Sequence, residues 1–402
     1  MNTRARKDME PYRLLFPCGV VAGVLGLMLW FFFQAGQVSF YPRQAHANIM
    51  YFGFLWSFVA GFLMTAIPKM TGTSLVHKYE MVTALGLVAL QIVVNFLNYV
   101  PASVAVYGIQ AVFLIVFIVR RFLKKRVLPF EGFLFIPFAF LQALLAVVMF
   151  FMSLQSSTPL SLQFLFQFAP SNSPTFSAQI SYQFSMDSFY LHAGEAFVLN
   201  LVLGLGTRLI PVLSRVPNSL TPDQRSNSNQ FMKMIVLAIL LNLGFILQTF
   251  VNNQLGIALR LLVVSFIAFR YFKIASSVST KSFVGFGLRC GILFILSSYA
   301  ILLFQPAQAI AVQHLIYIGG FVLITFMVGT RVMLAHGGQS LDYETDSRRI
   351  GAVALLFALA SLLRLVAGAD VFGAIMKIGI VVFLVASLLW FHKFIKILRD
   401  SK

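Results

Sequence analysis

Charged residues are scarce in this chain. Asp, Glu, Lys and Arg make up 10% of its 402 residues, whereas about a quarter is usual in a soluble protein. Hydrophobic residues account for 59%. Apolar runs of about 20 residues recur along the sequence, and each is long enough to cross ~30 Å of hydrocarbon as a helix. The composition excludes a soluble protein and predicts an all-α integral membrane protein, because helices pair their own backbone groups in lipid.

Cysteine is almost absent. The only two, Cys18 and Cys290, lie within apolar runs. This scarcity excludes a disulfide framework and a cysteine-based metal motif, and the sequence contains no Cys-x-x-Cys-His. We expect both cysteines to serve as packing residues in the apolar interior.

Acidic residues are few, so the formal net charge is +18. We do not read this charge as a nucleic-acid signal, because the basic residues lie in short connections between apolar runs, where they set membrane orientation. They gather on alternate connections, whereas the longest connection of the opposite side, residues 154–186, has no Lys or Arg. Both termini are therefore predicted in the cytoplasm of a bacterial cell, with the chain in its inner membrane. The first run, residues 14–33, is too long for a signal peptide and should be retained.

The apolar runs predict a polytopic bundle of about twelve transmembrane helices that forms a single domain, residues 1–402, with residues 154–186 as an extracytoplasmic loop. We expect membrane lipid to surround it. The predicted spans are 13–35, 48–68, 81–99, 102–120, 133–153, 187–213, 231–250, 254–272, 283–304, 309–334, 350–367 and 371–396.

Spans two, six and ten resemble one another. Each has a histidine near its outer end, at His46, His192 and His314. The tripeptide Gly-Thr-Arg ends spans six and ten at residues 206–208 and 329–331, 14 and 15 residues after their histidines. The similarity thus recurs at every fourth helix, which predicts three pseudo-repeats of four helices that meet at a central site.

These three histidines are candidate metal ligands. The topology places them at one depth, and neutral imidazole is a common ligand of iron and copper. The alternative for each is an interfacial polar residue that bonds to backbone or water. The shared depth favours ligand roles for His46 and His314, with His192 intermediate between the two interpretations.

Glu195 lies one helical turn after His192, on the same helix face. A carboxylate within a span is costly without a partner or a role. The two residues could bind a second metal, relay protons or form a simple buried pair. At the inner end of span ten, His336 could ligate a metal or cap the helix. His77 and His392 are expected at the surface.

Basic residues within spans are a further candidate group. Arg260, Arg364 and Lys377 fall in the outer third of the membrane, and Arg289 lies nearer the cytoplasm. They could extend to the lipid headgroups. Alternatively the outer three, with Arg43, could hold haem propionates, because guanidinium groups bind carboxylates well.

Three blocks of this sequence are distinctive. They are residues 11–17 with Gly19, residues 46–50, 52–54, 60–68 and 71–72, and residues 314–341. In these blocks the sequence resembles the NnrS family of membrane proteins. The resemblance implies a twelve-helix protein that contains haem and copper and takes part in nitric oxide metabolism or nitrosative stress. One departure is that Gln44 stands where the family usually has a histidine, and the position that is usually acidic is not acidic here.

The expected arrangement is also similar to the haem–copper oxidase core, in which spans two and ten supply the axial haem ligands. His46 and His314 are therefore the preferred haem ligands. Span seven has no histidine, so the dinuclear copper site of those oxidases cannot be transferred. An electron donor would be a quinol or a separate redox protein. A secondary transporter and an assembly factor without a cofactor are the alternative functions.

Overall fold

The computed structural model describes residues 10–127, 130–155, 186–216, 228–276 and 282–399. This part of the chain contains twelve helices long and apolar enough to cross a membrane, which confirms the predicted all-α polytopic bundle. The predicted loop at residues 154–186 lies almost wholly outside the described residues.

Each predicted span matches an observed helical segment to within a few residues. Four spans are divided into consecutive helical segments of different type. The segments are α2 (Pro11–Gln34), α3 (Arg43–Asn48), η1 (Ile49–Leu55), α4 (Trp56–Thr71), α5 (Lys78–Phe96), α6 (Val100–Leu123), η2 (Glu131–Leu134), α7 (Phe135–Gln155), η3 (Leu191–Ala196), α9 (Phe197–Leu213), α10 (Ser228–Phe250), α11 (Asn253–Arg270), α12 (Phe283–Phe304), η5 (Pro306–Gln308), α13 (Ala309–His314), η6 (Leu315–Val322), α14 (Leu323–His336), α15 (Tyr343–Asp346), α16 (Arg348–Ala367) and α17 (Ala374–Arg399).

Local chemistry explains where several helices begin and end. The side chain of Asn252 accepts a hydrogen bond from the Leu255 N–H, and this cap starts α11. Ser282 caps α12 in the same way. At the end of α4, Gly72 adopts a φ of +66°, a left-handed conformation that glycine reaches without strain. Short polar side chains and glycine thus divide an otherwise apolar chain into spans.

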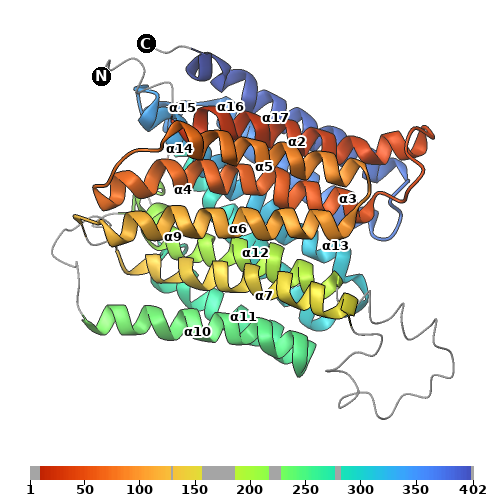
Figure 1. Ribbon diagram of the computed structural model, residues 1–402, viewed down its shortest axis with the longest axis horizontal. Helices are drawn as coiled ribbons and strands as arrows, with labels where there is room; N and C mark the ends of the chain where they lie inside the picture. Colours follow the sequence, from red (N-terminus) through yellow and green to blue (C-terminus); the bar gives the residue numbers. More distant parts are fainter. Residues whose placement is uncertain (1–9, 128–129, 156–185, 217–227, 277–281, 400–402) are drawn as a thin grey trace.

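The helices run back and forth along the long axis of the molecule (Figure 1). The end where α2 begins and α17 finishes, on the left of the figure, is called the basal end. The opposite end, which holds α3 and α13, is called the distal end. The predicted haem ligands His46 and His314 both lie at the distal end.

The second helix of each four-helix group lies at the centre of the bundle. In their most apolar windows, the spans Arg43–Thr71, Met186–Leu213 and Pro306–His336 are 78%, 72% and 67% buried, against 33–56% for the other nine. The outer helices expose apolar side chains such as Leu262, Val366 and Leu388, as contact with lipid requires. The predicted threefold repeat therefore corresponds to three central helices surrounded by nine outer ones.

Each central span also contains a π-helical segment, namely η1, η3 or η6, and no other described span does. A π segment adds a residue to a turn and is frequent at functional sites. The segments η1 and η3 pack closely: a Cβ on Gly194 of η3 would lie 2.8 Å from the ring of Tyr51 of η1. The three segments bring the central helices together next to the predicted histidines.

Candidate functional site

Two histidines at the distal end are oriented by backbone carbonyls. His46 lies in α3, shortly before η1, and its Nδ1 is 2.9 Å from the carbonyl oxygen of Gly26. His314 is the last residue of α13, and its Nδ1 is 2.6 Å from the carbonyl oxygen of Ile310. A carbonyl can only accept, so each Nδ1 carries the proton and each Nε2 keeps a free lone pair. This is the arrangement that metal-binding histidines usually show.

The two rings lie near each other and near a buried arginine. His46 and His314 interact electrostatically with each other, and both interact with Arg364 of α16. Both histidines are half-buried. The structure therefore brings together three of the residues that the sequence singled out.

Two buried donors in this group have no acceptor. Arg364 is 6% exposed, and its Nη1 donates to the carbonyl oxygen of Gly368 at 2.8 Å. Its Nε has no partner, and no carboxylate of the described residues lies within ion-pair distance. The indole Nε1 of Trp30, whose ring packs edge-on against His46 with centroids 5.7 Å apart, also has no partner. We call His46, His314, Arg364 and Trp30 the distal cluster.

The other basic residues within or next to the spans are more exposed than Arg364 or have other partners. Lys377 is exposed in the first turn of α17. Arg43 is 45% exposed and forms an ion pair of 3.6 Å with Asp187, itself 58% exposed. Arg289 is half-buried and donates to the carbonyl oxygen of Ser276 at 3.3 Å.

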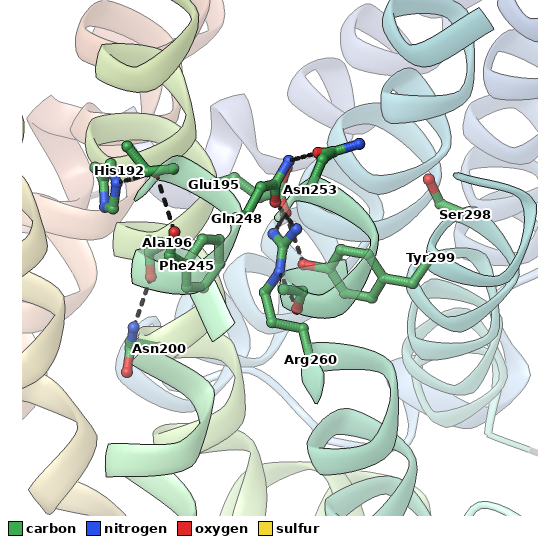
Figure 2. Close-up of polar contacts among 12 residues, drawn as sticks. His192, Glu195, Ala196, Asn200, Phe245, Gln248, Asn253, Arg260, Ser298 and Tyr299 are labelled. Atoms are coloured by element: carbon green, nitrogen blue, oxygen red, sulfur yellow. Dashed lines mark hydrogen bonds and ion pairs between the residues drawn. The ribbon is translucent and has the colours of Figure 1, made fainter. Parts of the chain in front are cut away.

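Arg260 has a different partner from the one that the sequence suggested. Its guanidinium Nη1 lies 2.5 Å from Glu195 Oε1, and both side chains are 1% exposed. A second nitrogen donates to Gln248, and the Tyr299 hydroxyl donates to the same Glu195 oxygen at 2.7 Å. Figure 2 shows these groups converging on the guanidinium. The assignment of Arg260 to a propionate is therefore replaced by this ion pair, which joins residues 65 positions apart in the sequence.

Aromatic rings and a close helix contact hold this arginine in place. The guanidinium lies over the ring of Phe245, 4.3 Å from its centroid, and over Tyr299 at 4.8 Å. A Cβ at Gly244 would lie 2.7 Å from Arg260 Cγ, so glycine at this position leaves room for the side chain. We call Glu195, Arg260, Gln248 and Tyr299 the central network.

Both ring nitrogens of His192 have side-chain partners. Its Nδ1 is 2.5 Å from Gln142 Oε1 and its Nε2 is 2.8 Å from Thr249 Oγ1. It makes no bond to Glu195, so the expected pair consists of two residues with separate partners. Across the described residues, no group of three or more His, Cys, Asp or Glu side chains could hold a metal ion.

A tyrosine connects the distal cluster to the central network. Tyr317 of η6 lies 5.8 Å from the His314 ring and meets Tyr51 of η1 edge-on, with centroids 5.2 Å apart. It also interacts electrostatically with Glu195 and Arg260. The π segments thus place aromatic hydroxyl groups between the two polar groups. Sequence reasoning missed this connection, although tyrosines five and three residues after His46 and His314 gave a signal.

The remaining histidines lie away from the distal cluster. His336 ends α14 at the basal end, where its Nδ1 contacts the Lys69 ammonium, and Lys69 also bonds to Glu10 at 3.0 Å. An imidazole nitrogen that accepts from an ammonium group is not free for a metal. His77 forms a capping box with Glu80 at the start of α5, and His392 is exposed. His77 and His392 therefore lie at the surface, as predicted.

These features define a polytopic helical membrane protein in which two histidines bonded to backbone carbonyls lie near buried donors without acceptors. Residues 9–402, nearly the whole chain, match the family model described as NnrS protein. The chain belongs to the NnrS family. No curated protein matched it.

Proposed function

We propose that this NnrS-family protein binds haem at the distal end, with His46 and His314 as axial ligands, and that it binds nitric oxide or a related ligand there. The setting would be nitric oxide metabolism or the response to nitrosative stress. Family membership and the geometry of the distal cluster support this proposal.

The observation that carries the proposal is the mismatch of donors and acceptors in the distal cluster. Because Nδ1 of each histidine bonds to a carbonyl, its Nε2 has a lone pair that can bind a metal. Arg364 and Trp30 present buried N–H groups without acceptors, and leaving such groups unpaired costs about 1–3 kcal/mol each. A haem fits this donor set, because it offers iron to the histidines and propionate oxygens to the unmatched donors.

The two histidines are held by different helices. His46 is hydrogen-bonded to Gly26 on another helix, α2. His314 is hydrogen-bonded to Ile310 on its own helix. Haem, when bound, would supply an iron that binds nitric oxide, and these two imidazoles would hold it.

Orientation and partners complete the proposal. The basal end faces the cytoplasm of the bacterial inner membrane, because the basic connections gather there. A quinol or a separate redox protein would supply electrons if the bound ligand is reduced.

The test is the optical spectrum of the protein purified from haem-replete cells. We expect a Soret band that is lost or shifted in His46→Ala and His314→Ala and unchanged in His392→Ala, a matched change of an exposed histidine. Nitric oxide should shift the band of the wild type. Absence of pigment, or a band identical in all three variants, would contradict the proposal. Ligand uptake by pigment-free vesicles would instead support the transporter alternative.

A further inference from the structure

An apolar cavity lies between the three central helices. All of its lining residues except Phe16 of α2 come from α4, α9 and α14. Its volume is about 80 Å³, several times the roughly 15 Å³ that one water molecule requires. The cavity therefore has room for a small molecule of a few heavy atoms.

The lining is almost free of polar groups. Thr325 is the only lining residue with a polar side-chain atom. A buried water needs two to four polar partners, and comparable apolar cavities stay dry and bind xenon or benzene. Transfer of a charged or strongly hydrogen-bonding ligand into such a site is unfavourable. The apolar lining therefore favours binding of a small, uncharged, apolar molecule.

The cavity lies directly basal to the point where the π segments meet. Its lining residue Val198 follows Glu195 by one helical turn, and Phe58 follows Tyr51 by two. Val59 and Val202, although they belong to the central spans, are only half-buried. Both line the cavity.

We infer that this cavity is a binding site for a small apolar gas molecule within the membrane-embedded centre of the protein. A gas dissolved in the bilayer partitions into such a space and is held one to two turns from Tyr51 and Tyr317. Binding in the cavity does not depend on haem. Delivery of the gas from the cavity to the distal cluster rests on the proposed function.

Xenon, an inert apolar probe, tests the binding. Crystals of the full chain under xenon pressure should show xenon between α4, α9 and α14. Val202→Phe and Thr325→Phe, which fill the cavity from two different helices, should reduce xenon occupancy at least tenfold. Val236→Phe, the matched change at an exposed position of α10, should leave it unchanged. If a phenylalanine variant does not fold, Val202→Ile should reduce occupancy by a smaller amount.

An empty cavity in the wild type, or equal xenon occupancy in the folded variants that fill it, would overturn the inference. The delivery role has a separate readout, the rate of nitric oxide binding to the pigment. Filling the cavity should slow that rate several-fold, whereas an unchanged rate would exclude delivery. A protein that binds xenon but contains no pigment would contradict the proposed function and leave the cavity site intact.

Discussion

The distal cluster and the central network are both polar groups buried among apolar helices, but only one of them is complete. Glu195 accepts from Arg260 and Tyr299, and Arg260 also donates to Gln248. In contrast, Arg364 and Trp30 keep buried N–H groups without acceptors. A matched network stabilises the fold by itself, whereas an unmatched one fits an additional acceptor. Under the proposed function, the central network stabilises the fold and the distal cluster binds haem.

The same contrast separates the three pseudo-equivalent histidines. His46 and His314 each use one ring nitrogen on a backbone carbonyl. His192 uses both nitrogens on the side chains of Gln142 and Thr249. A repeated sequence position therefore does not imply repeated hydrogen-bond partners, and under the proposed function this difference separates His192 from the two histidines that bind haem.

The largest expected effect is on the central network. Glu195→Ala leaves the Arg260 charge buried and unpaired, which should cost about 3–5 kcal/mol of unfolding free energy. Denaturant unfolding in detergent would measure the loss. Glu195→Ala combined with Arg260→Met should recover part of it, because the double variant removes the uncompensated charge. If Glu195→Ala cost no more than a surface change, the central network would not be a stabilising unit.

An intermediate effect is expected in the distal cluster. Arg364→Met removes a charged donor to the proposed propionate, so haem affinity should fall by about 1.5–3 kcal/mol, or roughly ten- to a hundredfold. Haem titration of the apoprotein would measure this, and the stability of the apoprotein should change less than in Glu195→Ala. Lys377→Met, at an exposed position of comparable depth, is the control. Equal haem affinity in both variants would remove Arg364 from the site.

The sequence predicted the spans well because hydropathy and bilayer thickness fix helix positions directly. The ninth predicted span, residues 283–304, coincides with α12. The sequence also placed His46 and His314 at the same end of the bundle, because the depth of a residue in a span follows from the topology. The π segments were missed, because an extra residue in a turn leaves hydropathy unchanged. Glycines inside all three segments, such as Gly53 and Gly194, were the available signal.

The central network could not be predicted from the sequence for a different reason. A carboxylate within a span requires a partner, and Glu195 had three basic candidates at similar depth in Arg260, Arg364 and Lys377. Hydropathy gives depth but not the rotation of a helix or its neighbours. Glu195 and Arg260 lie 65 positions apart in the sequence, so their pairing depends on how their helices pack. Only the folded structure shows which arginine pairs with Glu195.

The smallest effect should come from the exposed pair beside the distal cluster. Arg43 was a candidate for a propionate, but it faces Asp187 at 3.6 Å with both side chains about half exposed. Solvent screens such pairs, so Asp187→Asn should change stability by less than about 1 kcal/mol. Unfolding at low and high salt would show whether even this effect is screened. Because Arg43 lies close in sequence to His46, a large loss of haem in Asp187→Asn would extend the binding site to the surface and weaken the distinction between matched and unmatched groups.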